Sequence, residues 1–191
     1  MSTLKATLEE LQNATAGMTA QELLRHLMTE IFPGKCAISS SLRARSVAVL
    51  KMAAEIDPAV RVIFCHAPYV YAESVEYRER VVRRLGLTDV RDPEPADDDN
   101  EFFEDIRTSV WGGGDIESTV GLDAALDGVA CWISAAYHRP YPDTPPPRLT
   151  QEKRLIRVDA VHDWSQQQIY GYLARYDLPL HPRISTPTYH Y

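Results

Sequence analysis

The stretch from Cys36 to Met52, CAISSSLRARSVAVLKM, constrains the fold more than any other part of this 191-residue chain. It begins with an apolar run typical of a short strand, continues through a serine-rich turn and ends in the first turns of a helix. A helix N-terminus carries unpaired N–H groups and a partial positive charge, so a turn of this kind can hold an anion. Serine is also a common helix cap, and a capped helix with solvated arginines is the other interpretation.

Polar and cationic side chains crowd this turn and make it the main candidate binding site. Arginine grips phosphate or sulfate through two parallel hydrogen bonds, so Arg43 and Arg45 suit an anion although the turn contains no glycine. Serine hydroxyls add further hydrogen-bonding groups. The predicted ligand-binding residues of the turn are Ser39, Ser40, Ser41, Arg43, Arg45 and Ser46.

Strand-like and helix-like segments alternate along the rest of the chain. Beyond the strand that opens the serine turn, apolar runs predict strands at residues 60–65, 87–91, 129–134 and 154–161. Helical spacing and breakers predict helices at residues 3–13, 19–31, 72–85, 102–110 and 116–126, one from the serine turn to about 56, and one through 176 that Asp163 or Ser165 caps. This alternation predicts an α/β fold, a Rossmann-like parallel sheet covered on both faces and preceded by two helices.

Ligands of parallel sheets bind beyond the carboxyl ends of the strands, which brings three more residues to the predicted site. His66 follows the second strand, and His138 and Arg139 follow the fourth. His66 is the candidate general base because its ordinary pKa is near neutrality; the alternative is a histidine that only hydrogen-bonds the turn. No two histidines stand four residues apart, so we expect no metal site.

Composition and charge limit the partners. The chain is 45% hydrophobic and 25% charged, as expected of one domain with N-terminal helices (1–34), an α/β core (35–182) and a tail (183–191). A net charge of −7 argues against nucleic acid, and no apolar run is long enough to predict a membrane span. The three cysteines lie in or beside apolar runs, which predicts small buried hydrophobes, and without a signal peptide they indicate a reducing, cytoplasmic location.

Four segments carry a resemblance to a known family. Residues 39–46, SSSLRARS, resemble the SSFGxES-type phosphate loop of the phosphoadenylyl sulfate (PAPS) and adenylyl sulfate reductases, within the adenine-nucleotide alpha-hydrolase group. Residues 61–87 look like the family's second strand and its following helix, and GVACWISAAYHR at 128–139 is similar to the segment around its WITGxRR motif. The most specific likeness is HDWSQQQIYGYLARYDLPLHP, residues 162–182, to its ADWTxxDVxxYIxxHDLPxHP. The resemblance implies the family's fold and a nucleotide site at the serine turn.

The residues that differ from the family pattern matter for activity. Arg43 stands at the position of the family's glycine, Arg45 at its acidic position, and His138 at that of an arginine. The reductases act through a cysteine near the C-terminus, whereas this sequence has no cysteine after Cys131 and ends in STPTYHY. It also lacks the cysteines that hold an iron–sulfur cluster in some members. The resemblance therefore implies a family member without the family's own thiol and cluster.

Three functions follow as hypotheses. The first is a chain that has lost thiol-dependent reductase chemistry and binds an adenine nucleotide (ATP, PAPS or adenylyl sulfate) or a small phosphate or sulfate anion at residues 39–46. The second is a rewired reductase or ATP-pyrophosphatase-type enzyme that uses His66 or the cysteine of a partner. The third is a non-catalytic subunit that docks a protein partner, or a second copy, through the proline-rich loop at 139–150 or the tail.

Overall fold

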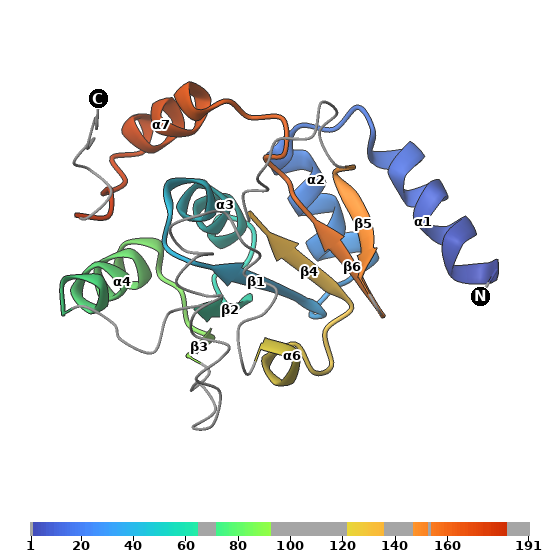
Figure 1. Cartoon of the computed structure of the whole chain (residues 1–191), viewed down its shortest axis with the longest axis horizontal. Coiled ribbons are helices and arrows are strands. Elements are labelled where there is room, and N and C mark those ends of the chain that lie inside the picture. The colour runs from blue at the N-terminus through green and yellow to red at the C-terminus, as the bar shows by residue number, and fades with distance from the viewer. Residues whose placement is uncertain (1, 65–71, 93–121, 136–146, 153, 183–191) are drawn as a thin grey trace, which may run out of the picture.

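The computed structural model describes residues 2–64, 72–92, 122–135, 147–152 and 154–182 (Figure 1). A six-stranded sheet in the order β3-β2-β1-β4-β6-β5 forms its centre. The strands are β1 (Cys36–Ser40), β2 (Arg61–Phe64), β3 (Val90–Arg91), β4 (Cys131–Ser134), β5 (Leu149–Glu152) and β6 (Leu155–Val158). Neighbouring strands run parallel except β5, which pairs antiparallel with β6. The predicted α/β fold is confirmed, and the predicted parallel sheet is parallel apart from its edge strand β5.

Within the described residues, the helices lie close to where the sequence places them. They are α1 (Ser2–Thr15), α2 (Ala20–His26), the π-helix η1 (Leu27–Ile31), α3 (Ala44–Ala54), α4 (Ala72–Leu85), α6 (Leu122–Ala125) and α7 (Gln166–Arg175). The helix predicted at 19–31 is thus an α-helix whose last five residues form a π-helix. Ser165, one of the two predicted caps, is the N-cap of α7.

The two faces of the sheet differ in how they are covered. Along β1 the side chains alternate, so Ile38 packs with the main core, which α2, α3, α4 and α7 complete. Ala37 belongs to a smaller cluster on the other face, with Ile63 and Trp132 of the neighbouring strands and Leu126 just after α6. Every residue of β1 is buried, so the central strand lies inside the molecule on both faces.

One strand was not expected. The sequence predicts an extended loop at residues 139–150, yet β5 begins at Leu149 and forms a hairpin with β6. The segment LTQE is short and mostly polar, and it follows a proline-rich run. Only its pairing with β6 therefore identifies it as a strand. The side-chain amide of Gln12 donates to the Leu149 carbonyl at 2.7 Å, which places α1 alongside this edge strand (Figure 1).

Several predicted features lie outside the described residues. They are the helix at 102–110, the first part of the helix at 116–126, most of the loop at 139–150, Cys65 and the tail at 183–191. Cys36 and Cys131 are free and buried, as predicted. Within the described part of the chain, no helix combines the length and apolar character needed to span a bilayer. The division at residues 34 and 182 stays a prediction.

The segment after α7 returns to α4. The hydroxyl of Tyr77 donates to the Pro179 carbonyl at 2.7 Å, and the His181 ring meets the Tyr77 ring edge-on, with 4.9 Å between centroids. Nε2 of His181 lies 3.0 Å from the hydroxyl of Ser74, in the first turn of α4. These contacts fix the chain that leaves α7 against the helix that follows β2.

The capping box of α7 gives the first prediction. Ser165 accepts a hydrogen bond from the N–H of Gln168, whose side chain accepts from the N–H of Ser165. Ser165→Ala should lower the free energy of unfolding by about 1 kcal/mol, because an N–H of the first turn loses its partner. Urea unfolding measures this. Gln167→Ala, an exposed neighbour outside the capping box, is the matched control, and an equal loss in both variants would contradict the assignment.

The buried phenol of Tyr77 gives a prediction on pH. Burial raises the pKa of Tyr77 to about 12 from an ordinary value of 10.0. Tyr77 in the unfolded chain loses its proton near pH 10, whereas the folded chain keeps it to about pH 12. The contribution of the protonated Tyr77 to the free energy of unfolding is therefore fully present below about pH 10 and is lost as the pH approaches 12. The stability advantage of the wild type over Tyr77→Phe should therefore shrink between about pH 9 and about pH 12. Chemical denaturation across this range measures it, and a constant advantage would argue against the burial of Tyr77.

Candidate functional site

The strand order places a candidate site beyond the carboxyl ends of β1 and β4. From β1 the chain continues to β2 and β3 on one side, whereas β4 and β6 lie on the other side. Such a reversal point is where open parallel sheets bind ligands. The β1–α3 loop starts at this point. The other predicted site residues, His66 after β2 and His138 and Arg139 after β4, lie outside the described residues, so their roles stay predictions.

A chain of hydrogen bonds closes the β1–α3 loop on itself. The N–H of Leu42 donates to the hydroxyl of Ser40 at 3.1 Å, and this hydroxyl donates to that of Ser46 at 3.0 Å. Ser46 in turn donates to the Arg43 carbonyl at 2.9 Å. Each hydroxyl has a single proton, so both protons are already used inside the loop. Ser40 and Ser46 thus hold the shape of the loop, and their predicted contact with a ligand stays a prediction.

Leu42 adopts the left-handed backbone conformation within this loop, with φ of 60°. A residue with a Cβ pays about 1–2 kcal/mol for that conformation, which is usually left to glycine. Strain of this kind clusters at ligand-binding loops. This conformation could not be predicted from the sequence, because leucine rarely adopts it.

The first turn of α3 differs from the first turns of α2 and α7. The N-cap residue Arg43 makes no capping hydrogen bond, and the first turn has no acidic residue. By contrast, Thr19 and Ser165 complete capping boxes on the other two helices. The N–H groups at the start of α3 therefore receive no hydrogen bond from the side chain of their own N-cap residue, and the helix dipole there is not offset by a carboxylate within the turn.

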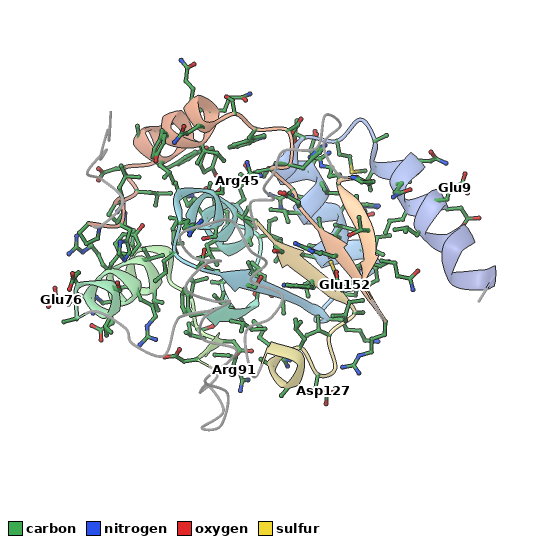
Figure 2. The ribbon with its side chains drawn as sticks, in the orientation of Figure 1. Glu9, Arg45, Glu76, Arg91, Asp127 and Glu152 are labelled. Carbon is green, nitrogen blue, oxygen red and sulfur yellow. The ribbon has the colours of Figure 1, made fainter. Side chains whose placement is uncertain are left out.

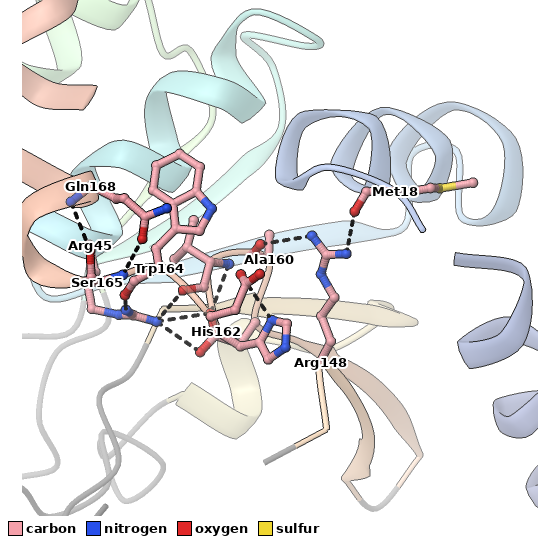
Figure 3. Close-up of polar contacts among 11 residues, drawn as sticks. Met18, Arg45, Arg148, Ala160, His162, Trp164, Ser165 and Gln168 are labelled. Carbon is pink, nitrogen blue, oxygen red and sulfur yellow. Dashed lines mark hydrogen bonds and ion pairs between the residues drawn. The ribbon is translucent and has the colours of Figure 1, made fainter. Parts of the chain in front are cut away.

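Arg45, in the same turn, points to another part of the chain (Figures 2 and 3). Its Nη2 donates to the Val161 carbonyl at 2.8 Å and lies 3.3 Å from the carboxylate of Asp159. Its Nη1 donates to the Trp164 carbonyl at 3.2 Å. The described contacts of the guanidinium thus tie α3 to the segment between β6 and α7. The predicted contact between Arg45 and a ligand stays a prediction.

The remaining predicted serines lie on either side of this network. Ser39 is 4% exposed, and its hydroxyl oxygen accepts the indole N–H of Trp132 at 2.8 Å. The guanidinium of Arg157 covers the ring of Trp132, 5.0 Å from its centroid. Ser41 is half-buried in the loop. The side-chain hydrogen bond of Ser39 therefore joins β1 to β4 just before the loop begins. Its position in the sequence did not reveal this role.

The described cysteines do not form a reactive thiol site. Cys36 and Cys131 are directly opposite each other in the β1–β4 register. The hydrogen bond between the two thiols, together with burial, raises the pKa of Cys131 well above its ordinary value. A buried thiol with a raised pKa forms little thiolate, which is the nucleophilic form. Across the described ranges, no group of three or more His, Cys, Asp or Glu side chains is placed to hold a metal ion.

The fold and this loop define an α/β protein in which a helix begins at the reversal point of the sheet. Residues 35–184 match the phosphoadenosine phosphosulfate reductase domain, and the chain belongs to that family.

Two similar proteins carry names that agree with this family assignment. Over 92% of its length the chain is 22% identical to a phosphoadenosine 5′-phosphosulfate reductase of Alkalilimnicola ehrlichii, of which it covers 75%. Over 95% of its length it is 25% identical to the enzyme of that name from Shewanella oneidensis, of which it covers 77%.

A solved structure shares the fold. The PAPS reductase of Candida auris, crystallised as a phosphate complex, superposes with a TM-score of 0.69. The match covers 93% of this chain and 89% of that one at 16% sequence identity, so it supports the architecture.

Two adjacent serines test the hydrogen-bond chain in the loop. Ser40→Ala should lower the free energy of unfolding by about 1–3 kcal/mol, because the N–H of Leu42 and the hydroxyl of Ser46 each lose a buried partner. Ser41→Ala should change it by less than about 0.5 kcal/mol. Denaturant unfolding of both variants gives the comparison. Equal effects would show that the loop does not depend on the Ser40 hydroxyl.

Proposed function

We propose that this chain binds the phosphate or sulfate group of an adenine nucleotide, or a free phosphate or sulfate anion, at the β1–α3 loop, residues 39–46. The observation that carries the proposal is the first turn of α3, whose N-cap side chain makes no capping hydrogen bond, which contains no carboxylate of its own, and which starts at the reversal point of the sheet. Its N–H groups and dipole favour an anion, and Arg43 at the N-cap adds a positive charge.

The family supports the chemical class of the ligand. Its curated relatives are named for phosphoadenosine 5′-phosphosulfate or adenosine 5′-phosphosulfate, which are sulfated adenine nucleotides. The solved neighbour is a phosphate complex. A nucleotide with a sulfate or phosphate group, and a place in sulfur metabolism, are therefore the ligand and setting that we propose.

The proposal includes the loss of thiol-dependent reduction by the chain itself. Cys36 and Cys131 are free thiols that are buried and hydrogen-bonded to each other. Reduction of a sulfated nucleotide to sulfite consumes two electrons, which a pair of thiols supplies as it becomes a disulfide. Neither described cysteine is placed to attack a sulfur outside the core.

A second candidate is a working reductase, which the names of the relatives favour. Its thiol would then be Cys65 or a thiol of another molecule. Release of sulfite from PAPS in the presence of a dithiol reductant measures this activity. Sulfite release by the wild type that Cys65→Ser abolishes would overturn the loss of reductase chemistry and leave the anion site standing.

Ligand-dependent melting tests the binding proposal. ATP, adenylyl sulfate, PAPS, adenosine 3′,5′-bisphosphate, phosphate and sulfate are compared. A ligand at 100 times its dissociation constant adds about 2.7 kcal/mol. The melting temperature of a chain of this size should then rise by about 5–10 °C.

Arg43→Ala should reduce the rise for the bound ligand, because a charge at the helix N-terminus is removed. Arg154→Ala is the matched control, since Arg154 pairs with Asp127 at the amino end of β6 and its loss should leave the rise unchanged. A chain that none of these ligands stabilises would refute the proposal and favour a non-catalytic subunit that docks a protein partner or a second copy.

A further inference from the structure

Arg45 joins the proposed anion site to a distant part of the chain. Its guanidinium makes contacts with Asp159, Val161 and Trp164, which are more than a hundred residues further along the sequence. The side chains of Arg45 and Asp159 are 16% and 15% exposed, so this ion pair is largely withdrawn from water. Two of the three acceptors are backbone carbonyls, which hold the guanidinium to the path of the chain as well as to a charge.

The position of Arg45 in the first turn of α3 also affects the energy of these contacts. It occupies the second residue of the helix, where a cation is opposed by the helix dipole. The carboxylate of Asp159 offsets this unfavourable interaction between the Arg45 guanidinium and the helix dipole. Asp159 itself is held by the N–H of Val161, which donates to its Oδ1 at 3.1 Å. The pair therefore fixes the first turn of α3 in one place relative to the segment that leads into α7.

We infer that Arg45 is a positioning residue for the anion site and that it couples ligand binding at the β1–α3 loop to the order of residues 159–175. The inference rests on the proposed function. Because the planar fork of Arg45 is directed at three acceptors outside the loop, its part in anion binding is to fix the N–H groups of the first turn before the ligand arrives. Any ligand that binds this fixed turn must, by reciprocity, stabilise the segment that holds it.

Two variants separate a positioning role from a ligand role. Arg45→Lys keeps the charge but lacks the planar fork that reaches the carboxylate and both carbonyls at once. Arg45→Met with Asp159→Asn removes both charges together, so that no unpaired charge is left buried. If Arg45 positions the turn, both variants should bind inorganic phosphate and adenosine 3′,5′-bisphosphate at least about tenfold more weakly in calorimetry, which is about 1.4 kcal/mol.

Arg148→Met is the matched control. Arg148 is a second half-buried arginine that donates to backbone carbonyls, those of Met18 and Ala160, and it ties the same segment to the turn before α2 (Figure 3). Its loss should lower the melting temperature but leave both affinities within about twofold of the wild type, because the first turn of α3 keeps its anchor.

Amide hydrogen exchange supplies a readout that stability alone does not move. Phosphate should slow exchange at residues 159–175 in the wild type and in Arg148→Met, but not in the Arg45→Met, Asp159→Asn variant. Retained affinity in Arg45→Lys with loss only in the double variant would make Arg45 a ligand charge and overturn the inference. Wild-type affinity in both Arg45→Lys and the double variant would also overturn the inference. A wild type that binds neither probe would instead refute the proposed function, and this inference with it.

Discussion

The whole structure depends on a central strand that is buried on both faces and still carries two polar side chains at its carboxyl end. All residues of β1 are buried, so the hydroxyls of Ser39 and Ser40 each need a partner inside the protein. Ser39 takes the indole of Trp132 on one face, and Ser40 takes Ser46 and the N–H of Leu42 on the other. The hydrogen bond of Ser39 joins β1 to β4, and those of Ser40 hold the turn that leads into α3. Together they set the position of the N-terminus of α3.

Charge at the start of α3 is arranged in two separate parts. Arg45 is compensated by Asp159, so the pair adds little net charge to the site. The N-cap residue Arg43 makes no capping hydrogen bond, and the first turn contains no carboxylate to offset the helix dipole. In the proposed function the loop offers an anion mainly the backbone N–H groups of this turn, and the directions of these groups depend on how firmly the turn is held. This is why the contacts of Arg45, which face away from the loop, bear on its function.

The sequence predicted the elements that local patterns specify and missed those that depend on distant partners. Apolar runs and capping residues placed β1, β2, α4 and the start of α7 to within one or two residues. The strand β5 was missed because LTQE becomes a strand only by pairing with β6. The same limit applied to the site: a serine-rich turn with two arginines was visible, but Arg45 meets Asp159 across 114 residues and Ser39 meets Trp132 across 93. No local pattern contains that information.

The buried cysteines restrict what this family member can do with a bound nucleotide. Because Cys36 and Cys131 face each other inside the core and the pKa of Cys131 is raised, electrons for a reduction would have to come from Cys65 or from a thiol outside this sequence. Recognition of an anion has no such requirement, since it needs only the fixed donors of α3. The proposed binding therefore needs only the first turn of α3, whereas reduction requires a thiol that the described core does not provide.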